Sequence, residues 1–248
     1  MIEIGIIVAL IVAILIASYF SRTKLREQRQ KKARKGIKEL SSLLDLIQRL
    51  QRHRGICANL SLNNQADQQA LSDDIEKIWQ KLLVNDYGGN VKRIRVQNQN
   101  WTAIAASPAN SFMPHCDLIE KLLHELTVIA DICSLTASNN KHDNADLWRN
   151  ILKRPQFAET LGKLRALGNK AASQKRCSAE VRIQLQYQLL NLRSNSLFDS
   201  NTKSIVDLVT NEILSPEVIQ IEPRVYFNLL TQAIDQQIEL TRNHLDRL

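Results

Sequence analysis

The sequence predicts an all-α protein, in which an N-terminal transmembrane helix precedes two packed halves that each resemble a four-helix bundle. The 248 residues include only 7 Gly and 5 Pro, so few positions interrupt a helix. Apolar residues recur at intervals of three and four along most segments, and none alternates with a period of two. Short polar turns separate the segments without a fixed repeat, which favours bundles over a solenoid.

The N-terminal segment predicts a membrane anchor over residues 1–21. Ile4 to Phe20 is an unbroken run of seventeen uncharged residues, at the short end of what crosses a bilayer core of about 30 Å. Glu3 precedes the run and positive charges follow it, the reverse of the charge order in a cleaved signal peptide. We therefore expect the span to be retained.

A basic juxtamembrane helix is expected over residues 22–36. Residues 21–54 contain twelve Lys or Arg against three acidic residues, whereas residues 55–248 are balanced. This asymmetry predicts a single-pass protein of the bacterial inner membrane with its C-terminal domain in the cytoplasm, although the cluster could also recognise lipid. The net charge of +8 therefore does not indicate a nucleic-acid partner. Four scattered cysteines suit a reducing compartment.

The predicted helical domain covers residues 37–248, in halves of about 37–138 and 145–248, divided by the polar segment 136–144. Helices of the first half are expected over 25–62, 65–84, 91–106 and 114–135. Those of the second half are expected over 147–152, 155–173, 179–198, 202–214 and 224–248, the last with a nearly heptad apolar seam.

The sequence predicts a protein that is not an enzyme and that uses no cofactor or metal. It contains no Gly-rich phosphate loop and no nucleophile elbow. His124-Glu125 begins like a zinc-protease helix, but Val128 occupies the position of the second zinc ligand. His115 and Cys116 share their predicted helix with His124 and Cys133 at spacings that do not converge on one metal.

Arg54 is the strongest lead to function. It continues an apolar stripe of the first long helix, whose members at helical spacing are Ile37, Leu40, Leu44, Ile47, Gln51, Arg54 and Ala58. Because Arg keeps its proton, a buried guanidinium needs an anion, either a carboxylate of the fold or a bound ligand.

Further arginines border apolar faces in the second half. Arg165 shares a helix face with Leu161 and with the small residues Gly168 and Ala172, which could leave room for a pocket. Arg176 continues that stripe if the helix persists, and Arg224 begins the last helix. For each of them alone, an internal salt bridge or a snorkelling side chain is the simpler interpretation.

Two motifs carry a resemblance to a known family. Leu50-Gln51-Arg52-His53-Arg54-Gly55 resembles the helix-one signature of the nitrate- and nitrite-sensing domain, and Tyr226-Phe227 with Thr231, Ile234 and Asp235 is similar to the pattern that closes it. Leu164 to Gly168 resembles a segment of helical bacterial sensor modules, whereas Ala172 to Cys177 resembles the family's central motif. The first similarity makes Arg165 the second arginine of the site, and the other makes it Arg176.

The resemblance implies paired four-helix bundles that bind nitrate or nitrite through arginines, with helix displacement carrying the signal. We therefore expect a membrane-anchored sensor in which Arg54 and Gln51, with Arg165 or Arg176, coordinate a small oxyanion. Its output is expected to pass to a separate signalling protein, and a homodimer is possible.

The alternative is a membrane-tethered, non-enzymatic scaffold that binds a protein partner, with its arginines paired to core carboxylates such as Asp131 or Asp235. A carboxylate within reach of Arg54 would favour the scaffold. Two arginines converging on a cavity would favour the sensor.

Overall fold

The described residues of the computed structural model form only helices, turns and loops, which confirms the predicted all-α class. The structure describes residues 2–58, 65–84, 91–108, 111–133, 135 and 141–248, with the backbone alone for 2–14, 65, 91 and 141–144. The helices are α1 (Ile2–Cys57), α2 (Gln65–Val84), α3 (Val91–Ala106), α4 (Phe112–Ile132), α5 (Lys141–Trp148), α6 (Arg154–Ser173), α7 (Ala179–Arg193), α8 (Ser200–Val209) and α9 (Pro223–Leu245).

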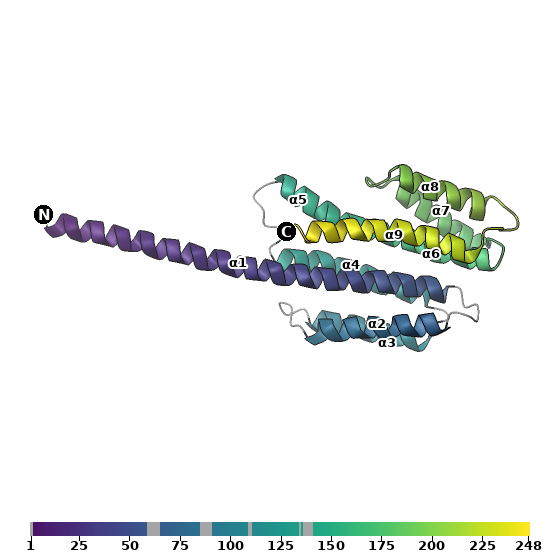
Figure 1. Ribbon diagram of the computed structural model, residues 1–248, viewed down its shortest axis with the longest axis horizontal. Coiled ribbons are helices and arrows are strands. Elements are labelled where there is room, and N and C mark those ends of the chain that lie inside the picture. Colours follow the sequence, from purple (N-terminus) through teal and green to yellow (C-terminus); the bar gives the residue numbers. More distant parts are fainter. Residues whose placement is uncertain (1, 59–64, 85–90, 109–110, 134, 136–140) are drawn as a thin grey trace.

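α1 organises the molecule. Its N-terminal half projects alone from the body, and its C-terminal half lies between α2 and α3 on one side and α6 and α9 on the other (Figure 1). This half is buried along two stripes, since Leu40 and Leu44 are as fully buried as Leu43, Leu46 and Leu50, whereas Asp45 and Arg49 are partly exposed and Arg52 is exposed. The two predicted halves therefore share α1 and one continuous apolar core.

The predicted helices 65–84, 91–106 and 114–135 agree closely with α2, α3 and α4, whereas the helix predicted over 25–62 is part of α1, which begins at Ile2 and ends at Cys57. The second half agrees less closely. The predicted break before Pro155 is instead a continuous run, in which the π-helical segment η2 (Arg149–Lys153) joins α5 to α6. Pro155 lacks an N–H and cannot complete the usual ladder, so a local widening of the helix accommodates it. A second π-helical segment, η3 (Thr210–Leu214), extends α8, and α7 ends at Arg193 rather than near 198.

α6 and α9 pack closely because a glycine allows them to approach. Any side chain at Gly168 would overlap the Tyr226 ring, whose hydroxyl donates a hydrogen bond to the Leu164 carbonyl at 2.9 Å. Tyr226 is fully buried, together with the apolar seam of α9 at Leu230, Ile234 and Ile238. This contact fixes α9 against the part of α6 that carries Arg165.

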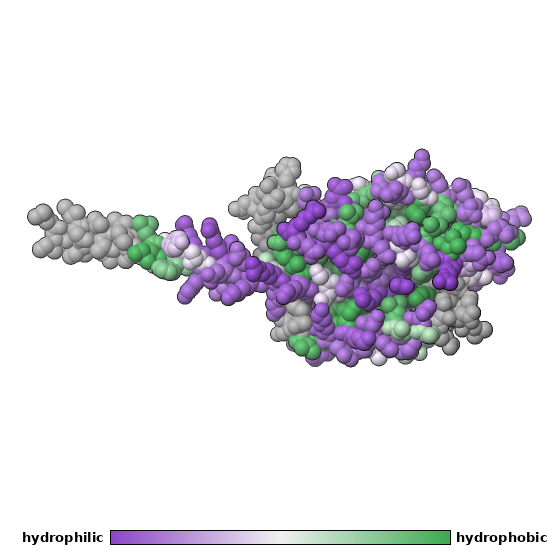
Figure 2. All heavy atoms as spheres, viewed as in Figure 1, coloured by the Kyte–Doolittle hydropathy of each residue, from purple (hydrophilic) through white to green (hydrophobic). Residues whose placement is uncertain are grey.

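Within the described part of the chain, no helix combines the length and apolar content needed to cross a bilayer. Most of the predicted span, Ile4 to Phe20, lies among residues 1–14, whose side chains are outside the described part. Figure 2 shows apolar atoms followed by a polar stretch along the projecting part of α1.

Candidate functional site

Arg54 is buried near the C-terminal end of α1, where α1 meets α4 and α6. Its side chain is 0% exposed. A Cβ atom at Gly162 of α6 would lie 2.9 Å from Arg54 Nη2, so the absence of a side chain there leaves room for the guanidinium. The predicted burial of Arg54 is therefore confirmed.

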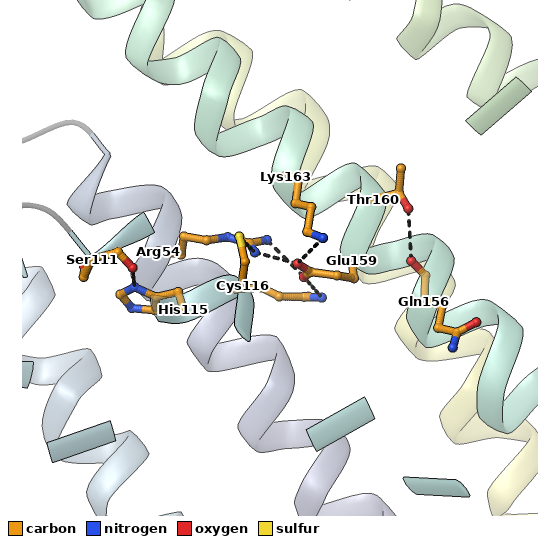
Figure 3. Close-up of polar contacts among 9 residues, drawn as sticks. Arg54, Ser111, His115, Cys116, Gln156, Glu159, Thr160 and Lys163 are labelled. Atoms are coloured by element: carbon orange, nitrogen blue, oxygen red, sulfur yellow. Dashed lines mark hydrogen bonds and ion pairs between the residues drawn. The ribbon is translucent and has the colours of Figure 1, made fainter. Parts of the chain in front are cut away.

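Glu159 of α6 supplies the anion that Arg54 needs. Arg54 Nη1 and Nη2 donate to Glu159 Oε1 and Oε2 at 2.5 and 3.0 Å, a two-point ion pair (Figure 3). Nη1 also approaches Cys116 Sγ of α4 at 3.1 Å. Burial alone would lower the pKa of Arg54, but the carboxylate outweighs it and the pKa is raised. The charge of Arg54 is therefore neutralised within the fold.

Gln51 belongs to the same network. Its amide Nε2 donates to Glu159 Oε2 at 3.0 Å, and Lys163 lies 3.9 Å from the other carboxylate oxygen. Gln51 is thus directed at the carboxylate that binds Arg54. Glu159 thus takes the place that we predicted for a core carboxylate such as Asp131 or Asp235.

Arg165 lies six residues after Glu159 on α6, and fewer of its donor nitrogens have a hydrogen-bond partner than those of Arg54. Its residue is 2% exposed, its guanidinium lies 4.7 Å from the centre of the Phe227 ring, and Nη1 donates to Thr231 Oγ1 at 2.8 Å. Nε and Nη2 have no hydrogen-bond partner among the described residues. Burial, with the nearby charge of Arg54, lowers the pKa of Arg165 to about 9.

A cavity of about 260 Å³ adjoins Arg165. Four helices contribute to its lining: α1 with Gln48, Arg49 and Arg52, α2 with Leu71 and Asp74, α6 with Arg165, and α9 with Thr231, Ile234 and Asp235. Three arginines thus face two aspartates, which leaves one net positive charge. Asp235 already accepts a hydrogen bond from Gln48 at 2.6 Å, and Asp74 pairs with Lys77 at 3.0 Å.

The structure therefore divides the predicted site residues among three places. Arg54 and Gln51 bind Glu159, Arg165 lines the cavity, and Arg176 is exposed in the turn that follows α6. α6 ends at Ser173, so the stripe predicted to continue to Arg176 is interrupted before reaching it. Arg49 and Arg52 of the cavity were not among the predicted site residues.

A second polar cluster lies on the other side of α1. His53, Cys57 and His115 are buried, and their potential ligand atoms all lie within 4.8 Å of one another. Spacing within the predicted helix of His115 gave no set of metal ligands, and no metal was expected. Across the helix interface, His115 of α4 instead meets His53 and Cys57 of α1.

No family model, curated protein or solved structure matches this chain.

Proposed function

We propose that this protein is a membrane-anchored cytoplasmic sensor that binds a small monovalent oxyanion, nitrate or nitrite, in the cavity beside Arg165. One observation carries the proposal: a buried guanidinium with two donor nitrogens lacking hydrogen-bond partners among the described residues lines a cavity. Leaving buried charged donors unsatisfied costs free energy that a bound anion would recover.

The composition of the cavity supports a small, singly charged ligand. Arg49, Arg52 and Arg165 exceed the two aspartates by one charge, so a monovalent anion would neutralise the site. The planar guanidinium of Arg165 matches a planar oxyanion, and the Phe227 ring holds its plane in position. Arg54, whose charge Glu159 already neutralises, acts in this proposal as a structural neighbour and not as a ligand.

The position of the cavity between α1 and α9 suggests how binding would be transmitted. Arg242 of α9 is bound to Asp45 and Gln48 of α1 at 2.6 and 2.7 Å, and Gln48 to Asp235 at 2.6 Å. An anion that draws Arg49 and Arg52 toward Arg165 would exchange these polar contacts and shift α1 along α9. Signalling requires that the two arrangements differ in anion affinity.

The membrane anchor remains part of the proposal. Leu15, Ile16, Tyr19 and Phe20 are all more than half exposed on the projecting part of α1, and exposed Lys and Arg residues follow them. Exposed apolar side chains beside positive charges suit a segment leaving a bilayer on its cytoplasmic side. A separate signalling protein would then receive the displacement of α1.

Calorimetry on the full chain in detergent, with nitrate and nitrite as titrants in a buffer of poorly coordinating anions, tests the proposal. We expect binding by the wild type and by Arg176→Met, the matched control at an exposed arginine, and its loss in Arg165→Met. Absence of heat with both anions, or equal binding by Arg165→Met, would overturn anion sensing at this site.

The alternative is a non-enzymatic, membrane-tethered scaffold that binds a protein partner. The ion pair between Arg54 and Glu159 favours it, because the charge of Arg54 needs no ligand. A scaffold predicts that none of the arginine variants alters binding of either anion, so the same calorimetry separates the two functions.

A further inference from the structure

The side chains of His53, Cys57 and His115 are suitable metal ligands, and none of them lines the anion cavity. His53 and Cys57 lie one turn apart on the same face of α1, and His115 faces them from α4. The exposed fractions are 0% for both histidines and 5% for Cys57. Two imidazoles and one thiol in a buried position are ligands that borderline and soft transition metals prefer.

The distances are close to those of a coordination sphere. Cys57 Sγ lies 3.5 Å from His53 Nδ1, and His53 Nδ1 lies 2.8 Å from His115 Nε2. A metal ion with nitrogen ligands near 2.0 Å and sulfur near 2.3 Å places neighbouring ligand atoms about 3.3–3.7 Å apart. The sulfur–nitrogen spacing already fits, and the two imidazoles need to separate by only about half an ångström.

Each imidazole also has an oxygen partner for its other nitrogen. His115 Nδ1 lies 2.7 Å from the Ser111 carbonyl oxygen, which can only accept, so Nδ1 carries the proton and Nε2 offers its lone pair. His53 Nε2 lies 3.1 Å from Ser72 Oγ of α2. Such outer partners orient the ligating rings in most protein metal sites.

We propose that His53 Nδ1, His115 Nε2 and Cys57 Sγ bind one thiophilic metal ion, for which Cu⁺ is the best match. A thiolate and two neutral imidazoles with Cu⁺ form a complex of zero net charge. Zn²⁺ would leave one positive charge in a dry interior, close to the guanidinium of Arg54, which follows His53 in the chain. The choice of Cu⁺ therefore follows from the cost of buried charge.

Binding releases one proton. In the metal-free protein, the proton on His53 Nδ1 bridges to His115 Nε2. The Ser72 hydroxyl, which lies 3.0 Å from the Gln68 carbonyl oxygen and 3.1 Å from His53 Nε2, then donates its one proton to His53 Nε2 instead of to Gln68. When the metal binds, His53 carries its proton on Nε2 and donates it to Ser72 Oγ, so no imidazole proton is lost. The Cys57 thiol loses its proton to solvent as the metal–sulfur bond forms.

Burial supports this account of the protonation states. It lowers the pKa of His53 to about 4 and that of His115 to about 3, so both rings are neutral and able to ligate at pH 7. It raises the pKa of Cys57 to about 12. Metal binding must therefore compete with a proton at sulfur, and affinity should rise with pH.

The test is competition between the full chain and a chromogenic Cu⁺ chelator under anaerobic, reducing conditions, repeated with Zn²⁺ and a Zn²⁺ chelator. We expect the wild type to withdraw one equivalent of Cu⁺. Cys57→Ser and His115→Gln should each weaken binding at least tenfold, and Ser72→Ala should weaken it about tenfold. Cys177→Ser and His124→Gln, outside the cluster, are the matched controls and should bind as the wild type.

X-ray absorption of the wild-type complex keeps the test decisive if a cluster variant fails to fold. The expected copper environment is two nitrogens and one sulfur. Withdrawal of Zn²⁺ alone, with the same variant pattern, would support the three-ligand site and overturn its assignment to Cu⁺. Failure to withdraw either metal, equal binding by folded cluster variants, or two sulfurs at the copper would overturn the site.

Discussion

Arg54 and Glu159 form a buried two-point ion pair between helices α1 and α6, across 105 residues of sequence. The pair joins the helix that leads to the N-terminus to the helix that carries Arg165. Because each charge lies in the interior, each depends on the other for compensation. Breaking this buried pair should therefore cost more stability than breaking an exposed ion pair of the protein.

Replacing Glu159 by Gln should lower the free energy of unfolding by about 3–5 kcal/mol, because the charge of Arg54 would stay buried without an opposite charge. Urea unfolding followed by circular dichroism measures the change. Lys77→Gln, which breaks an exposed pair with Asp74, is the control and should leave stability nearly unchanged. A loss no larger than that of the control would contradict the structural role of the pair.

Gly168→Ala should destabilise the protein, although Gly→Ala inside a helix ordinarily stabilises the helix by as much as about 1 kcal/mol. The added methyl group would overlap the hydroxyl oxygen of Tyr226 and two carbons of its ring. We expect thermal unfolding to show a lower Tm. Removing the hydroxyl as well, in Gly168→Ala/Tyr226→Phe, should recover only part of the loss, since the ring carbons also clash. An unchanged or raised Tm in the single variant would contradict the close packing of α6 and α9.

Arg165→Met should, without added anion, leave stability equal to the wild type or higher by about 1–3 kcal/mol. The variant removes a buried charge whose Nε and Nη2 lack hydrogen-bond partners among the described residues, at the cost of one hydrogen bond to Thr231. Urea unfolding in the same buffer measures it. A loss above about 2 kcal/mol would mean that the contacts with Phe227 and Thr231 dominate.

Glu39 should give the stability of the protein a pH dependence opposite to that which a salt-bridged carboxylate gives. Burial raises the pKa of Glu39 to about 8, aided by Glu125 and opposed by Lys35. The folded protein therefore binds this proton more tightly than the unfolded chain, and the contribution to stability, present below pH 4.5, is lost as the pH rises through 8. That loss is on the order of a few kcal/mol.

The difference in unfolding free energy between the wild type and Glu39→Gln isolates this group from other titrations. We expect the free energy of unfolding of the variant to rise steadily relative to that of the wild type from pH 4.5 to above 8. A constant difference over that range would show that Glu39 titrates normally.

The sequence predicts well where the helices lie and which of their residues are buried. It predicts poorly which side chains of different helices contact each other. The stripe through Gln51 and Arg54 follows from periodicity within one helix, and both residues are buried. Glu159 could not be named as the partner of Arg54, because which face of α6 meets α1 depends on long-range packing. His53 was not among the predicted site residues for a related reason: the prediction followed one buried stripe of α1, whereas the helix has two.

That second stripe does have a signal in the sequence. Leu43, Leu46, Leu50, His53 and Cys57 recur at intervals of three and four, and all of them are buried. A helix whose apolar positions occupy two stripes is typical of a central helix rather than a peripheral one. His53 and Cys57 lie one turn apart on that stripe, a spacing that favours a shared site with a side chain of another helix.

The unbroken course of α1 gives the protein a long mechanical lever. At 56 residues, the helix extends about 84 Å, with a rise of 1.5 Å per residue. Both polar clusters lie within its last three turns, so a tilt of about 5° around them would carry the opposite end through about 7 Å. Sub-ångström adjustments around His53 or Arg52 would thereby become displacements comparable to a full helical turn at the far end.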